Sequence, residues 1–239
     1  MIVLRSLVTY IALILYIAIV GPIGLVLGIV LRWTDGLYRL GHGGVRLGLA
    51  LAGIRWKVAG REHMPRTAVV YCSNHESNVD PPVLFEVLHP RLKILYKAEL
   101  RRFPIMKTAF DVAGFVAVDR ADRDQAFASI SKGAESLREG NTFLIFPEGT
   151  RSRTGSLLPF KKGGFIMAIE AQAPIVPVAI QGGRDSMRKG SAFVRPVNVS
   201  VRIGAPVPTA GLTLDDRDAL IAQVRGEVQK LLDEGPLWT

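Results

Sequence analysis

A histidine and an aspartate lie five residues apart in Asn74-His75-Glu76-Ser77-Asn78-Val79-Asp80, directly after the apolar run Ala68–Ser73. A carboxylate at this spacing can hold the imidazole of His75 in one tautomer, which leaves the other ring nitrogen free to take a proton from a hydroxyl. An unperturbed imidazole titrates near pH ~6.5, which suits a base at neutral pH. Pro81 after Asp80 is typical of a helix start with Asp80 as the N-cap. The pattern therefore predicts a strand-to-helix loop in which His75 could act as a general base, although a histidine near an aspartate is also common in proteins without that role.

A second polar segment, Phe146–Arg153, also follows an apolar run directly. Gly149 permits a tight turn there, and hydroxyls and forked cationic donors follow in Thr150, Arg151, Ser152 and Arg153. Lys97, at the end of a third apolar run, supplies a further cation. These groups suit the binding of a phosphate, although Phe146–Arg153 alone is equally compatible with a solvated loop and Lys97 alone is more simply a surface lysine.

These polar segments need elements that place them together. Short runs rich in Val and Ile predict strands at Ile54–Ala59, Ala68–Ser73, Leu92–Tyr96, Phe115–Val118, Thr142–Phe146, Ile175–Ile180 and Val197–Ile203. Apolar periodicity predicts helices at Pro81–Leu88, Pro104–Ala113, Arg123–Glu139, Gly164–Gln172 and Asp215–Asp233. The third has Phe127, Ile130, Ala134 and Leu137 on one face, with Asp122 as N-cap. The alternation predicts an α/β fold, a largely parallel sheet flanked by helices, with the site at the carboxyl ends of its strands.

The N-terminal segment predicts attachment to a membrane. Ser6–Leu31 holds 26 residues without a charge, and as a helix it would be about 39 Å long against a hydrocarbon core of about 30 Å. Gly21-Pro22 predicts a kink, and a sharp break there would give a re-entrant hairpin instead. A cleaved signal peptide fits less well, because the apolar stretch is too long. Leu37–Ile54 predicts a helix lying in the interface. We therefore divide the chain into a membrane-associated helical segment, residues 1–53, and an α/β domain, residues 54–239.

The formal net charge of +9 favours phosphate-bearing partners and anionic lipid surfaces. The sequence has no zinc-ligand spacing and no interleaved basic and aromatic stretch, which argues against nucleic acid. Basic residues follow the apolar segment, so the positive-inside rule predicts a cytoplasmic location for the main domain at the cytoplasmic membrane. The single cysteine, Cys72, lies in an apolar run and is predicted to be a buried strand residue.

The combination of motifs resembles the glycerolphosphate and 1-acylglycerolphosphate acyltransferases over roughly residues 70 to 182. Their first motif, Asn-His-x-Ser-x-x-Asp, is matched by Asn74, His75, Ser77 and Asp80, and their third, Phe-Pro-Glu-Gly-Thr-Arg-Ser, is matched in full from Phe146 to Ser152. Weaker matches are Lys97, Glu99 and Leu100, then Gly114 with Val118, Asp119 and Arg120, and finally Val176, Pro177 and Val178. Ala117 stands where the family often has an aromatic residue, which leaves the shape of the acceptor or acyl pocket open.

The resemblance implies a catalytic pair and a phosphate site. His75 would be the general base and Asp80 would orient it. The substrate-binding residues would be Lys97, Arg120, Glu148, Gly149, Thr150 and Arg151. No metal and no cofactor is expected. The implied reaction moves an acyl chain from acyl-CoA or acyl-ACP to the sn-2 hydroxyl of 1-acylglycerol 3-phosphate and gives phosphatidic acid for phospholipid biosynthesis.

The expected partners are the lysophospholipid, the acyl thioester, the membrane and, as one of the two donors, acyl carrier protein; nucleic acid is not expected. Two alternatives remain open. The acceptor could be another lysolipid, such as lysophosphatidylglycerol or a lyso amino-acid lipid. The chain could also be a lipid-binding membrane protein without catalysis, although the intact His75–Asp80 pair argues against that. Hydrolysis lacks support, because no Gly-x-Ser-x-Gly nucleophile motif is present.

Overall fold

The computed structural model describes residues 1–119, 122–187 and 191–238. Its centre is a seven-stranded sheet with the order β1-β7-β6-β2-β5-β3-β4. The strands are β1 (Ile54–Ala59), β2 (Val70–Ser73), β3 (Leu92–Lys97), β4 (Val116–Val118), β5 (Thr142–Ile145), β6 (Ile175–Gln181) and β7 (Val197–Ile203). All neighbouring pairs are parallel except β6 with β7. The predicted α/β fold with a largely parallel sheet is confirmed.

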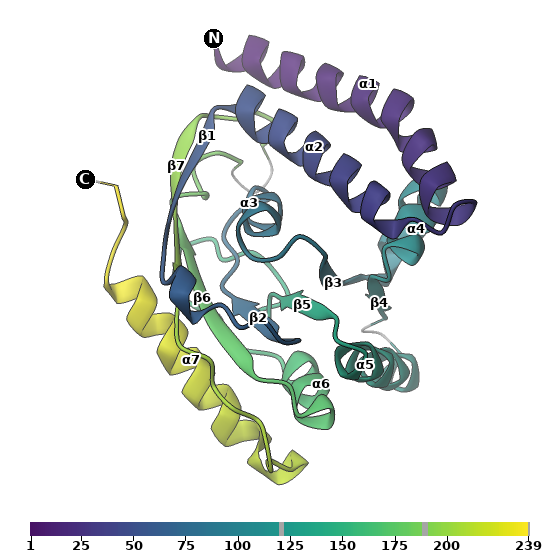
Figure 1. The fold of residues 1–239 in the computed structure, drawn as a ribbon. Helices are drawn as coiled ribbons and strands as arrows, with labels where there is room; N and C mark the ends of the chain where they lie inside the picture. Colours follow the sequence, from purple (N-terminus) through teal and green to yellow (C-terminus); the bar gives the residue numbers. More distant parts are fainter. Residues whose placement is uncertain (120–121, 188–190, 239) are drawn as a thin grey trace.

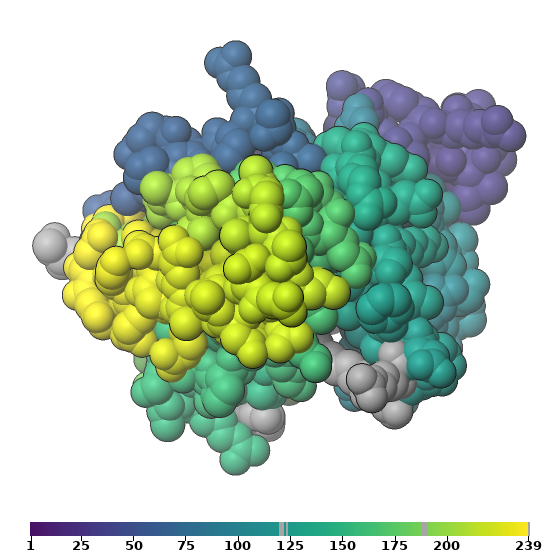
Figure 2. All heavy atoms as spheres, turned by 90° about the horizontal axis from the view of Figure 1, so that it is seen from below, coloured from purple at the N-terminus to yellow at the C-terminus, as the bar shows by residue number. Residues whose placement is uncertain are grey.

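Helices cover both faces of the sheet (Figure 1). They are α1 (Ile2–Ile29), α2 (Thr34–Ala52), α3 (Asp80–Val87), α4 (Pro104–Val112), α5 (Arg123–Arg138), α6 (Gly163–Ala171) and α7 (Arg217–Asp233), with 3-10 turns η1 (Arg61–His63), η2 (Ala98–Arg102) and η3 (Leu214–Asp216). One face carries α3 with α2 and α1 outside it, and the other carries α5, α6 and α7. Figure 2 looks onto the α7 side, where α7 lies in front and α1 lies behind it on the opposite side of the molecule.

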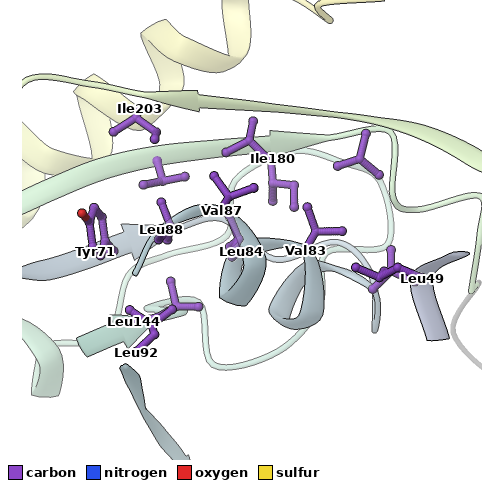
Figure 3. Packing of buried hydrophobic residues seen from close by; sticks show 14 of the residues in the cluster. Leu49, Tyr71, Val83, Leu84, Val87, Leu88, Leu92, Leu144, Ile180 and Ile203 are labelled. Carbon is purple, nitrogen blue, oxygen red and sulfur yellow. The ribbon is translucent and has the colours of Figure 1, made fainter. Parts of the chain in front are cut away.

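Within the described residues, three buried apolar clusters hold these layers together. Figure 3 shows Val83, Leu84 and Leu88 of the α3 region surrounded by side chains of the sheet and by Leu49 of α2. Leu84 is fully buried, one helical turn after Asp80, and full burial of such a side chain stabilises the fold by about 1.5–3 kcal/mol. The packing of α3 therefore fixes the position of Asp80 at the start of the helix.

The predicted elements agree with the observed ones to within a few residues, and Asp122 caps α5 as expected by accepting from two backbone N–H groups of the first turn. Two local expectations are wrong. Asp80 is the first residue of α3 and not its N-cap, because its carboxylate turns back to the preceding loop instead. Phe127 is 57% exposed although its helical neighbours Ile130, Ala134 and Leu137 are buried. It lines an open cleft and not the core.

Helix α1 continues through Pro22 without interruption, so the sharp break that would give a re-entrant hairpin within it is not observed. It is the one helix in the described part of the chain that is long and apolar enough to cross a membrane. Gly53, at φ +72°, ends α2 in a left-handed cap, and β1 begins at the next residue. The division of the chain at residue 53 into two domains stays a prediction.

Helix α1 is attached to the rest of the protein along its length, not only at one end. The Ser6 hydroxyl accepts from the backbone N–H of Val194 at 2.9 Å, and the Tyr16 hydroxyl donates to the carbonyl of Leu40 in α2 at 2.8 Å. Near its C-terminal end, a Cβ added to Gly28 would lie 2.5 Å from a methyl group of Val112 in α4, so the two helices are in close contact there. Both halves of α1 are therefore held against the α/β domain.

Candidate active site

The carboxyl ends of β2, β3, β5 and β6 meet at one edge of the sheet because these strands are parallel. The loop after β2 contains His75, and the loop after β5 contains Glu148 to Ser152. The backbone N–H of Ser152 donates to the carbonyl oxygen of His75 at 2.8 Å. The sheet thus brings together two polar segments that are more than seventy residues apart in the sequence.

His75 and Asp80 form the predicted pair. The Nδ1 atom of His75 lies 2.9 Å from one carboxylate oxygen of Asp80, whose side chain is fully buried. The same oxygen accepts the backbone N–H groups of Glu76 and Ser77, each at 2.7 Å. An ionised carboxylate only accepts hydrogen bonds, so Nδ1 must carry a proton and Nε2 must be the unprotonated nitrogen of neutral His75. The ring also stacks on Phe146 at 4.3 Å between centroids, which fixes its plane.

Three further contacts hold the His75 loop in place. The side-chain amide of Asn74 donates to the carbonyl of Ile180 and accepts its backbone N–H, at 2.9 and 2.8 Å. The backbone N–H of His75 donates to Glu148 at 2.8 Å. Glu76 accepts the N–H of Gly183 at 2.9 Å, in the turn after β6. The loop is therefore anchored to both strands that flank β2.

Glu148 supports the loop from a buried position. One carboxylate oxygen accepts from His75 and the other accepts from the backbone N–H of Leu158 at 2.9 Å. The residue is only 3% exposed, and burial raises the pKa of its carboxyl above the usual range. Both oxygens are thus bonded within the chain, and the binding of the acceptor by Glu148 stays a prediction.

Glu76, the residue after His75, is a second titratable group of this loop, and the sequence analysis gave it no role. Burial, with the negative charge of Asp80 as a smaller contribution, raises the pKa of its carboxyl to about 7. Hydrogen bonds from the backbone of Gly183, Arg184 and Gly182 oppose that shift. A carboxyl with a pKa near neutral pH therefore lies within the His75 loop itself.

An open cleft of about 1140 Å³ reaches His75. Its walls include Phe146, Gly149 and Phe127, and two lysines, Lys161 and Lys162, lie along it. The backbone N–H of Lys161 donates to the carbonyl of Pro147 at 2.8 Å, so the lysines are fixed to the loop after β5. Sequence reasoning missed these two cations, although Phe160-Lys161-Lys162-Gly163-Gly164 places them directly before a helix and could have signalled them.

The predicted phosphate ligands are only partly gathered at this cleft. Gly149 lines it and has φ +69°, a left-handed conformation that favours glycine and supports the tight turn. Thr150 is exposed and Arg151 is half-buried, and the guanidinium of Arg151 has no hydrogen bond or ion pair among the residues the structure describes. Lys97 is well exposed and forms an ion pair with Glu99 at 2.7 Å. Arg120 lies outside the described residues.

A second cavity, about 760 Å³ in volume and almost wholly apolar, lies between α1, α2 and α4. Its walls reach Asn78, Val79 and Pro82, which belong to the loop and helix that carry the His75–Asp80 pair. Glycines on α1 and α2 keep it open, and a Cβ added to Gly41 would meet no atom within 4 Å. The edge of the sheet that carries His75 thus adjoins both an open cleft and an apolar cavity.

The hydrogen-bonded pair His75–Asp80 lies at the strand ends of an α/β fold, which is where such folds place their sites. Within the described residues, no group of three or more His, Cys, Asp or Glu side chains could hold a metal ion. The family model for acyltransferases matches residues 55–181, and the chain belongs to the acyltransferase family. That match contains every sequence-predicted site residue.

The most specific similarities are to enzymes that act on 1-acylglycerol 3-phosphate. The chain is 37% identical over 187 residues to the mouse 1-acyl-sn-glycerol-3-phosphate acyltransferase alpha, covering 77% of this chain and 66% of that protein. It is 34% identical over 206 residues to the 1-acyl-sn-glycerol-3-phosphate acyltransferase of Limnanthes douglasii, covering 84% and 73%. The crystal structure of the 1-acyl-sn-glycerophosphate (LPA) acyltransferase PlsC from Thermotoga maritima superposes with a TM-score of 0.84 at 25% identity, over 98% of this chain and 95% of that one.

Proposed function

We propose that this protein transfers an acyl chain from an acyl thioester to the sn-2 hydroxyl of 1-acylglycerol 3-phosphate, giving phosphatidic acid. The observation that carries the proposal is the His75–Asp80 pair at 2.9 Å, with His75 facing an open cleft. The names of the relatives and of the structural neighbour support the choice of acceptor. Acyl-CoA and acyl-ACP both fit the proposal as donors, and no cofactor is required.

The reaction needs one base and no covalent intermediate. The Nε2 atom of His75 takes the proton of the sn-2 hydroxyl while the oxygen of this hydroxyl attacks the thioester carbonyl. The tetrahedral intermediate then collapses, the carbon–sulfur bond breaks, and the thiolate receives the proton from His75. The carboxylate of Asp80 stabilises the positive charge that forms on the imidazole between these two steps. Cys72 plays no part, because it is fully buried and burial raises the pKa of its thiol.

The acceptor phosphate requires cations near the cleft. Arg151 is the first candidate: it follows Gly149 of the cleft wall by two residues, it is half-buried, and its guanidinium has no hydrogen bond or ion pair within the described part of the chain. Lys97 can join it by exchanging Glu99 for the phosphate. Gly149 and Thr150 would shape the turn that presents Arg151. The acyl chain would lie in the apolar cavity, where Gly41 and its neighbours leave room beside the catalytic loop.

Helix α1 supports attachment of the protein to a membrane. Because α1 is held to the domain near both ends, through Ser6 and Gly28, it cannot cross a bilayer without drawing the domain in with it. An orientation in the plane of one leaflet keeps its exposed apolar side in lipid and leaves the α/β domain in water. The excess of basic residues after α1 supports a cytoplasmic location of the domain.

The test is a reaction with purified protein in detergent or nanodiscs. Wild type and His75→Ala are each given 1-acylglycerol 3-phosphate with acyl-CoA or acyl-ACP, while free thiol and phosphatidic acid are measured. We expect both products from wild type with at least one donor, and a loss of roughly 10²-fold or more in the variant. A folded wild type that releases no thiol with either donor would refute the proposed acceptor, and a panel of other lysolipids would then be compared by mass analysis of their products.

A further inference from the structure

Exposed apolar side chains outside α1 are concentrated in one short segment. After Trp33, seven large hydrophobic side chains are exposed in the described part of the chain. Four of these seven lie between residues 100 and 106. These four are Leu100, Phe103, Ile105 and Met106, with exposed fractions of 36%, 46%, 64% and 37%. They occupy the end of η2 and the first turn of α4, and we call them the α4 tip. Such a cluster on a soluble surface marks an interaction site.

The α4 tip continues the apolar surface of α1. Helix α4 packs on the C-terminal half of α1, where a Cβ on Gly28 would lie 2.5 Å from Val112. Three tip residues, Phe103, Ile105 and Met106, line the apolar cavity together with residues of α1 such as Ile17. The tip and α1 thus border the same cavity. Since the apolar side chains of both are exposed, they form one continuous apolar surface.

Basic side chains border the tip. The guanidinium of Arg102 lies over the ring of Phe103 at 5.0 Å, and no carboxylate within the described residues pairs with it. Lys107 and Arg101 both contact Asp111, at 3.3 and 2.8 Å. Exposed apolar side chains beside arginine and lysine are typical of a surface that enters the boundary between lipid headgroups and acyl chains.

We propose that the α4 tip inserts into the same lipid leaflet as α1 and forms a second point of membrane contact. This inference rests on the membrane attachment stated under the proposed function. One helix lying in a leaflet leaves the domain free to rotate about the helix axis, whereas a second contact beside it fixes that rotation. The fixed orientation turns the side of the apolar cavity that α1 and the α4 tip line toward the lipid from which a lysophospholipid would enter.

The single buried cysteine allows a direct test. Cys72 is fully buried, so one added surface cysteine can be labelled selectively with the environment-sensitive fluorophore NBD. The test variant is Ile105→Cys. The matched control is Leu214→Cys, whose parent side chain is 46% exposed and lies in η3, on the side of the molecule opposite α1. Both proteins are mixed with vesicles of phosphatidylcholine and phosphatidylglycerol, with and without lipids brominated on the acyl chain.

We expect the label at position 105 to shift its emission to the blue, to gain roughly twofold in intensity and to be quenched by the brominated lipids, as for a group in the acyl-chain boundary. The label at position 214 should change little. The proposal is overturned if the protein floats with vesicles while position 105 behaves like position 214. It is also overturned if the shift at position 105 occurs without lipid and depends on protein concentration, which indicates a second copy as the partner. Since the readout needs no catalysis, an inactive protein with an inserted tip would refute only the acceptor assignment.

Discussion

Replacing Asp80 with asparagine separates the charge of this carboxylate from its shape. The oxygen that contacts His75 also accepts two backbone N–H groups, from Glu76 and Ser77, at 2.7 Å each. An amide NH₂ cannot accept hydrogen bonds, so these two donors hold the amide oxygen of asparagine in the same place. His75 then keeps its hydrogen bond and its tautomer. The substitution therefore removes the negative charge and little else at the base.

The magnitude follows from the charge that forms on His75 when it takes the proton. Two unit charges 4 Å apart at an effective dielectric constant of about 20 interact by about 4 kcal/mol. The contact between Nδ1 and the carboxylate oxygen is 2.9 Å, but the charge of the ring is spread further away and is only partly formed in the transition state. We expect a loss of about 3 kcal/mol of transition-state stabilisation, which is roughly 10²-fold in kcat/KM.

The assay is thiol release with 1-acylglycerol 3-phosphate as acceptor, together with thermal unfolding. The other oxygen of Asp80 is buried without a hydrogen-bond partner among the described residues, so an NH₂ placed there is expected to cost about 1–3 kcal/mol of stability. Activity is therefore compared at a temperature where both proteins are folded. In the double variant with His75→Ala, the Asp80→Asn change should add almost no further loss, because it acts through His75.

Two results would refute this reasoning. An Asp80→Asn variant with kcat/KM within about threefold of wild type, less than 1 kcal/mol, would mean that the charge has no role in the reaction. A double variant far less active than His75→Ala alone would mean that Asp80 acts independently of the histidine.

Three further predictions concern the groups around the pair. Glu148→Gln should lower the free energy of unfolding by about 1–3 kcal/mol, because glutamine cannot accept from both backbone donors; a raised KM for the acceptor with an unchanged Tm would instead make Glu148 a substrate ligand. Gly41→Leu should fill part of the apolar cavity and shift the acyl preference toward shorter chains, whereas Gly226→Leu, also without neighbours within 4 Å but remote from the cavity, should not. The pKa of Glu76 is about 7 in the folded protein, above the usual value of ~4.3. The contribution of the protonated Glu76 carboxyl to stability is therefore lost as the pH rises through 7. The variant Glu76→Gln should flatten the dependence of Tm on pH between about 5 and 8.

The sequence was a good guide to the elements because their signals are local. The strands Ile54–Ala59 and Val197–Ile203 have the predicted bounds, and Asp122 caps α5 as expected. Apolar periodicity, turn residues and caps act over a few residues, and a single sequence contains them in full. Phe127 shows where periodicity fails, because a position on the apolar face of a helix can border an open cleft instead of the core.

The contact between His75 and Asp80 was also predictable, because their spacing within one loop is itself a local feature. The hydrogen-bond partners of Glu148 could not be predicted in this way. Its carboxylate accepts N–H groups from His75 and Leu158, and these partners are brought to it only by the pairing of β2 with β5. The raised pKa of Glu76 likewise comes from burial in the folded protein, and its partner Gly183 is more than a hundred residues further along the chain. Neither the burial of a carboxylate nor its partners can be derived from the residue type alone.

The sequence by itself determined the order of strands and helices, the motif residues and the apolar character of the first helix, since each depends on neighbours along the chain. Only the tertiary structure decided how α1 is placed. Contacts near both of its ends, through Ser6 and Gly28, tie it lengthwise to the domain, whereas length and hydropathy alone allowed it to cross a membrane. The same packing places the α4 tip beside α1, because contacts between residues about eighty positions apart depend on how the whole chain folds and not on any local pattern.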